Sequence, residues 1–140
     1  MSEAEVAVVK PRSLAKGLIA GLIGGVAGTV AMAIAERIFL ASAQHETEPG
    51  SKHTSDGIRW GLGAAVGAAY GAVAEFYPAA TTNDGASFGV TLEALAHQGM
   101  LPAVGLLTKK SAADGATEMT AHLVYGVATE TVRGFVRKRL

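Results

Sequence analysis

Four stretches of the chain are predominantly apolar, and polar segments separate them. Residues 17–35 carry no charge, and residues 60–74 form a second uncharged run. Residues 85–107 carry one formal charge, Glu93, and residues 116–132 are less apolar. A helix over residues 17–35 would be about 30 Å long, which is the thickness of a bilayer's hydrocarbon core. The pattern predicts helices over about 17–38, 57–77, 85–107 and 116–136, and no period-two alternation indicates strands.

Lipid is favoured over water as the solvent of the first two helices. A surface helix of a soluble bundle has one polar face, whereas 17–38 and 57–77 are apolar or glycine on every side. We therefore predict an all-α integral membrane four-helix bundle over residues 17–136, with a tail at 1–16 and a basic tail at 137–140. A soluble four-helix bundle remains an alternative. The last helix fits either a span or an amphipathic helix at the membrane interface.

The first apolar run also has features of a cleavable signal peptide. Basic residues precede it, and Ala33-Ile34-Ala35 resembles a cleavage site. The run is longer than the usual apolar region of about 7–15 residues. The apolar segments that follow also fit a polytopic protein, so we favour a transmembrane span.

Composition narrows the possible functions. Charged residues make up 17% of the chain, against about 25% in an average soluble domain. The absence of Cys excludes disulfides, iron–sulfur centres, thiolate zinc sites and a cysteine nucleophile. Twelve basic residues balance twelve acidic ones, so we expect no nucleic-acid partner.

The distribution of basic residues predicts the orientation of the spans. Three basic residues lie in the N-terminal tail and four near the C-terminus, against five on the opposite side: Arg37, Lys52, Arg59, Lys109 and Lys110. Positive charge favours the cytoplasm. We therefore predict a multi-pass protein with both termini cytoplasmic. The cluster Arg137, Lys138 and Arg139 either serves as a plain topology anchor or touches anionic lipid headgroups.

Glycines recur every four residues along the first two helices. Residues four apart share one helix face, and a face without side chains lets two helices approach closely. We predict tight packing of these helices, a glycine zipper, within one subunit or between subunits. The residues of the predicted stripes are Gly17, Gly21, Gly25 and Gly28 in the first helix and Gly63, Gly67 and Gly71 in the second.

The candidate chemistry lies in the last two helices. Each contains a Glu and a His four residues apart, so that a carboxylate and an imidazole share one face. Ionisable groups are costly in hydrocarbon unless paired, so we expect them to face each other inside the bundle. The loop lengths suggest that Glu93 and Glu130 lie at matching depth. The expected polar cluster comprises Glu93, His97, Glu118, His122, Tyr125, Thr129 and Glu130.

Three hypotheses remain open for this cluster. It is a structural hydrogen-bond network, a proton relay that uses the titration of His near neutral pH, or a site for haem b or a metal ion. His97 and His122 are the candidate ligands of the third hypothesis. No catalytic triad and no phosphate-binding glycine loop followed by Lys is present. The patterns therefore favour a protein without enzymatic activity, and no cofactor is predicted.

The chain contains short motifs at residues 16–25 with 35–37, 59–63 with 70–71, 96–97, and 122–126 with 129–130. In their order and spacing these motifs resemble the YagU-like inner-membrane proteins. The resemblance covers most of residues 15–135, although Arg59 stands where that family has a His before the Trp of the second span. It implies a small bacterial inner-membrane protein of uncharacterised mechanism, in a family with a link to acid tolerance.

These observations lead to a functional prediction. We expect a small membrane component with a structural or stress-linked role at the cell envelope, including acid stress. Its expected partners are the lipid bilayer and either further copies of itself or a larger membrane complex that it serves as an accessory subunit. The alternative is a redox or proton-conducting membrane subunit that uses the His and Glu residues of the last two helices.

Overall fold

The computed structural model describes residues 11–42, 52–96 and 112–140, and every regular element in these ranges is helical. The prediction of an all-α chain without strands is therefore confirmed for this part of the molecule. The elements are α1 (Leu14–Ser42), α2 (Lys52–Phe76), the 3-10 segment η1 (Pro78–Gly85), α3 (Ala86–Leu95) and α5 (Ala112–Arg139).

The helices α1, α2 and α5 extend beyond the apolar stretches 17–35, 60–74 and 116–132 from which they were predicted. α1 begins at Leu14 because Ser13 caps it: Ser13 Oγ accepts from Lys16 N at 3.4 Å. α5 continues to Arg139, with three basic residues in its last turn, where cations stabilise the helix dipole. The described part of the helix expected over 85–107 is α3, and residues 97–107 lie outside the described residues.

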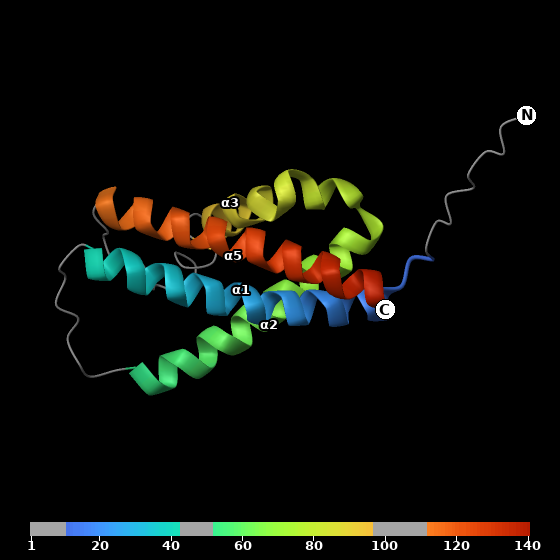
Figure 1. The fold of residues 1–140 in the computed structure, drawn as a ribbon, viewed down its shortest axis with the longest axis horizontal. Coiled ribbons are helices and arrows are strands. Elements are labelled where there is room, and N and C mark those ends of the chain that lie inside the picture. Colours follow the sequence, from blue (N-terminus) through green and yellow to red (C-terminus); the bar gives the residue numbers. More distant parts are fainter. Residues whose placement is uncertain (1–10, 43–51, 97–111) are drawn as a thin grey trace, which may run out of the picture.

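Helix α1 lies between α2 and α5, and α3 packs on α5 (Figure 1). The segment η1 reverses the chain between α2 and α3. Its last residues, Asn83, Asp84 and Gly85, have φ values of 56°, 52° and 85°. Asn and Asp tolerate this left-handed conformation better than most residues. The turn predicted by the sequence Asn-Asp-Gly is thus present.

The interior of the bundle consists of small and polar residues, whereas large apolar residues lie outside. The buried apolar residues are Ala20, Tyr70, Ala74, Ala121 and Tyr125, and the buried polar residues are Thr29, Glu93, Thr129 and Arg133. By contrast, Leu22 is 47% exposed, Ile34 52% and Ile58 68%. In a soluble domain, by contrast, large apolar residues are among those most often buried, and charged residues are almost never buried unless paired. The distribution of apolar and polar side chains is therefore reversed here.

One helix among the described residues is long and apolar enough to cross a membrane, over Leu14–Phe39 of α1. Among the described residues, α2 and α5 do not have this property, and the expected third span, 85–107, is described only to residue 96. α2 is rich in Gly and Ala, which are only weakly apolar, and α5 carries ionisable groups along its length. Length and composition therefore support a span at α1.

Candidate functional site

The glycines of α1 and α2 bring the two backbones into contact. A Cβ atom added at Gly17 would lie 2.7 Å from Gly71 O. One added at Gly25 would lie 2.9 Å from the Cα atom of Gly67, and Gly21 and Gly63 lie in the same interface. Real Cβ atoms do not approach other atoms this closely, so this interface leaves no room for a side chain.

A second glycine face of α1 meets α5. A Cβ at Gly28 would lie 2.9 Å from both a ring carbon and the carbonyl oxygen of Tyr125, and would collide with Thr129 Oγ1. On the other side of α5, Gly126 packs against the backbone of Gly89 in α3. α5 therefore contacts α1 on one side and α3 on the other, and both contacts depend on glycine.

The structure brings Glu93 of α3 and His122 of α5 together. His122 Nδ1 lies 2.6 Å from Glu93 Oε2 and 2.9 Å from the carbonyl oxygen of Glu118. The carbonyl oxygen of Glu118 can only accept, so a proton on Nδ1 is donated to it, and Glu93 Oε2 lies at ion-pair distance from the same nitrogen. The Glu93 side chain is 8% exposed, and a buried carboxylate requires such a donor.

The remaining residues of the expected cluster have separate environments. Tyr125 of α5 donates its hydroxyl proton to Gly63 O of α2 at 2.7 Å. Thr129 is fully buried against Gly28, and Glu118 lines a cavity together with His122. His97 lies outside the described residues, so the predicted pairing of two histidines is not part of the described structure.

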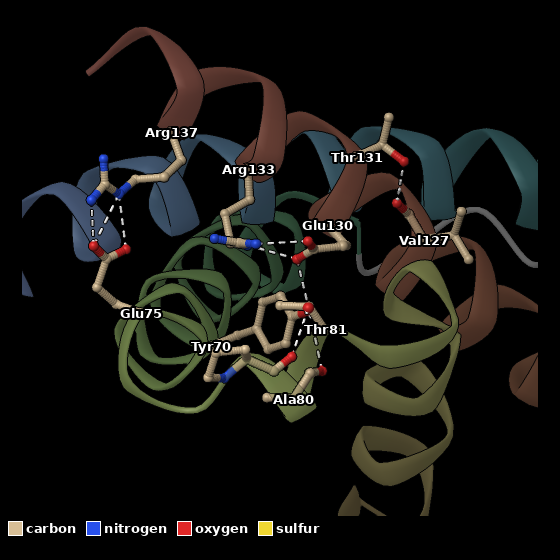
Figure 2. A network of polar contacts seen from close by, with 10 residues as sticks. Tyr70, Glu75, Ala80, Thr81, Val127, Glu130, Thr131, Arg133 and Arg137 are labelled. Atoms are coloured by element: carbon tan, nitrogen blue, oxygen red, sulfur yellow. Dashed lines mark hydrogen bonds and ion pairs between the residues drawn. The ribbon is translucent and has the colours of Figure 1, made fainter. Parts of the chain in front are cut away.

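Glu130 is the centre of a second polar group. Arg133 Nε and Nη2 donate to its two carboxylate oxygens, each at 2.6 Å. The Tyr70 hydroxyl of α2 donates to Glu130 Oε2 at 2.8 Å. Figure 2 shows both side chains pointing at this carboxylate. The bidentate geometry is the strong form of an Arg–carboxylate pair.

A third polar group joins the ends of three elements. Arg137 Nε lies 2.9 Å from Glu75 Oε2, and Arg137 Nη2 lies 2.5 Å from Glu75 Oε1 (Figure 2). Ser13 N, at the start of α1, donates to the same carboxylate at 2.9 Å. The hydrogen bonds to Glu75 raise the pKa of Arg137 above its already high ordinary value, so this guanidinium stays charged.

The expectation that Glu93 and Glu130 lie at matching depth is wrong. Gly89 of α3 lies beside His122 of α5, and Gly85 lies beside Gly126 and Glu130. This register places Glu93 near His122, toward the N-terminal part of α5. Glu130 instead pairs with Arg133, one turn along its own helix. The sequence estimate was counted from assumed helix ends at residues 107 and 116, whereas the register between α3 and α5 is set by these glycine contacts.

Sequence reasoning did not select Tyr70, Glu75 or Phe88, although all three lie in the polar groups or beside them. The Tyr70 ring stacks on Phe88 with centroids 4.0 Å apart. In the sequence, Glu75 is merely the first charge after an uncharged run. By contrast, Glu130 and Arg133 lie three residues apart on one helix, and this spacing indicates in the sequence that they can form an ion pair.

A cavity of about 850 Å³ lies between α2, α3 and α5. Its wall is mostly apolar, with Leu62, Val66 and Leu92 among the lining residues, and His122 and Tyr125 reach it from α5. Within the described ranges, no group of three or more His, Cys, Asp or Glu side chains is arranged to hold a metal ion. His122, the partner of Glu93, thus borders this mostly apolar cavity.

Comparison with known families gives one match. The family described as "Protein of unknown function (DUF1440)" matches residues 31–131. This range is most of the chain and includes α2, η1, α3, most of α5 and the Glu93–His122 pair, whereas Arg133 and Arg137 lie beyond it. No curated protein and no solved structure matches the chain significantly. The chain therefore belongs to the uncharacterised family DUF1440.

Proposed function

We propose that this member of DUF1440 is a multi-pass integral membrane protein of the bacterial inner membrane, with both termini in the cytoplasm. In this proposal it has a structural or stress-linked role at the envelope, as a homo-oligomer or as an accessory subunit of a larger membrane complex. The resemblance to the YagU-like proteins suggests acid stress as the condition. The observation that carries the membrane proposal is the reversed distribution of apolar and polar residues.

The outer surface of α1 supports the membrane proposal most strongly. Leu18, Leu22, Val30 and Ile34 are all more than a third exposed, while Thr29 on the same helix is 2% exposed. Full burial of a Leu or Ile yields about 1.5–3 kcal/mol, and in water each of these side chains forgoes roughly half of it. In lipid the same side chains are solvated, and it is the polar residues that must be buried and paired.

The length of the apolar band matches a bilayer. Lys16 and Arg37 flank it on α1, about 32 Å apart along the helix axis. Trp60 on α2 and Tyr77, directly after the end of α2, are exposed about 26 Å apart, the positions that interfacial aromatic residues take in membrane proteins. The hydrocarbon core of a bilayer is about 30 Å thick.

The polar groups suggest a structural role. Each of them connects two or more elements: Glu93–His122 connects α3 to α5, Tyr70–Glu130 connects α2 to α5, and Glu75–Arg137 connects α2 to α5 near the start of α1. In a bilayer such pairs hold helices together, since no water competes for the donors. They also leave the outer surface apolar for lipid or for a partner helix.

Cysteine labelling tests the number of spans and their orientation without background, because the chain contains no Cys. Single cysteines are introduced by Ser2→Cys, Ser51→Cys, Thr82→Cys and Ser111→Cys, and intact spheroplasts are treated with an impermeant maleimide. We expect labelling at 51 and 111, and labelling at 2 and 82 only after lysis. Labelling at 2 and 51 on the same side would contradict the first span. Recovery of the chain in the supernatant of untreated lysate would contradict membrane insertion.

A second candidate function rests on the buried Glu93–His122 pair, which borders the apolar cavity. An imidazole and a carboxylate in contact can pass a proton, so a proton-conducting subunit is the alternative. Its test is proton flux into proteoliposomes, with Glu93→Gln and Glu130→Gln as variants. Flux that Glu93→Gln abolishes would support conduction, whereas flux equal to that of empty liposomes would exclude it. A Soret band in the purified protein that His122→Ala removes would instead indicate haem.

A further inference from the structure

We propose that the end of the bundle where α1 begins and α5 ends binds the headgroups of anionic phospholipids. This inference rests on the proposed membrane location. We call this end the basic end and define it by its six cationic residues, Arg12, Lys16, Arg133, Arg137, Lys138 and Arg139. They come from opposite ends of the sequence, and the fold brings them together (Figure 1).

Three contacts hold the start of α1 and the end of α5 side by side. Arg137 Nη2 donates to Pro11 O at 3.1 Å. Lys16 Nζ donates to the carbonyl oxygen of Leu140. The Glu75 carboxylate accepts from both Ser13 N and Arg137. The basic residues of α1 and α5 therefore form one surface, which neither terminus would provide alone.

The charge of the two ends differs. Three side-chain carboxylates lie near the basic end, Glu75, Asp84 and Glu130, so its side chains carry six positive and three negative charges, an excess of three positive side-chain charges. The described charges at the other end are Arg37, Arg59, Glu36, Glu93 and Glu118, two positive and three negative. The excess of positive charge at the basic end is the complement of an anionic lipid surface.

Two of the three carboxylates are already engaged. Glu130 is bound by Arg133 and Glu75 by Arg137. Among the described residues, no ion pair joins Arg12 or Arg139 to a carboxylate, and both side chains are exposed. The Arg139 guanidinium lies over the Phe135 ring, 3.4 Å from its centroid. These two guanidinium groups are available to an anion from outside the chain.

The position of these groups along the bundle matches that of lipid phosphates. Leu14 and Phe135 are exposed apolar side chains beside the basic end, so the charges lie where the apolar band stops. A lipid phosphate lies just outside the hydrocarbon, and guanidinium binds phosphate through two parallel hydrogen bonds. A negatively charged cytoplasmic leaflet would therefore meet Arg12 and Arg139 directly.

The test measures lipid selectivity of the full chain. The protein is reconstituted in vesicles of equal phosphatidylglycerol and phosphatidylcholine and extracted in mild detergent, and the bound lipids are quantified by mass spectrometry. We expect phosphatidylglycerol to be enriched. Arg12→Gln with Arg139→Gln should reduce this enrichment by roughly fivefold for each charge removed. The controls are Arg12→Lys with Arg139→Lys, which keeps the charge, and Arg37→Gln at the other end. Both should keep most of the enrichment.

The outcomes separate this inference from the proposed membrane location. A protein that floats with the vesicles and resists alkaline extraction, but binds both lipids equally, would overturn the lipid inference alone. Equal loss of enrichment in Arg37→Gln and in the Arg12→Gln, Arg139→Gln variant would also overturn it, because selectivity would then not depend on the basic end. A protein that does not float would contradict the membrane location itself.

Discussion

The packing of α1 against α2 can be tested by the single substitution Gly67→Ala. The added carbon would lie 2.5 Å from Gly21 O and 2.7 Å from Gly25 N. Comfortable contacts between carbon and its neighbours lie at about 3.5–4.0 Å. Both obstructing atoms belong to the backbone of α1, which cannot rotate aside as a side chain can. The two helices must therefore move apart by about 1 Å.

The size of the effect follows from two opposing contributions. Overpacking of a close interface costs about 1–3 kcal/mol, whereas replacing a helical Gly by Ala gains at most about 1 kcal/mol. We expect Gly67→Ala to lower the free energy of unfolding by about 1–2 kcal/mol. Gly21→Ala meets the same interface from the other helix, so the two losses should not add in the double variant.

Gly61→Ala is the matched control. It lies on the same helix as Gly67 and makes the same chemical change, but a Cβ at Gly61 meets nothing within 4 Å. Unfolding in mixed micelles with increasing dodecyl sulfate, followed by far-ultraviolet circular dichroism, measures both variants. Gly61→Ala should match or slightly exceed the wild type. Equal midpoints for Gly61→Ala and Gly67→Ala would refute the close approach of these helices.

Three further substitutions test other parts of the bundle by the same unfolding assay. Glu130→Ala should cost about 3–5 kcal/mol, because it leaves the buried Arg133 guanidinium without its carboxylate; an unchanged midpoint would contradict the buried pair. Gly85→Ala should cost more than about 1 kcal/mol, because φ is 85° and the added carbon would lie 2.6 Å from Glu130 Cβ. Phe88→Ala should cost at least about 1 kcal/mol, because its half-buried ring stacks on Tyr70, and an unchanged midpoint would contradict this stack.

The helical elements could be predicted from the sequence because charges and apolar residues are segregated along it. The uncharged runs 17–35 and 60–74 both lie inside helices, and the Asn-Asp-Gly turn lies between α2 and α3. The helix ends could not be predicted in this way. α1 begins at its Ser13 cap, and α5 continues through three basic residues. Both of these helix ends lie outside the apolar stretches, so the apolar pattern does not mark them.

The polar contacts were only partly accessible to sequence reasoning. A spacing of four residues correctly indicates that Glu118 and His122 share a face, but it does not give the register between two helices. That register is set by glycine contacts such as Gly89 with His122 and Gly126 with Gly85. The contact of Tyr70 with Glu130 spans 60 residues of sequence, and no local pattern encodes it.

The proposed membrane location requires that lipid, and not water, surrounds the outer surface of α1. Spin labels at Leu22→Cys and Ile34→Cys in the reconstituted protein test this directly, with Thr82→Cys in η1 as the exposed control. Relaxation by oxygen, which concentrates in hydrocarbon, is compared with relaxation by a water-soluble nickel complex. We predict that oxygen dominates at 22 and 34 and that nickel dominates at 82. Nickel access at 22 and 34 equal to that at 82 would contradict the proposal that lipid surrounds the outer surface of α1.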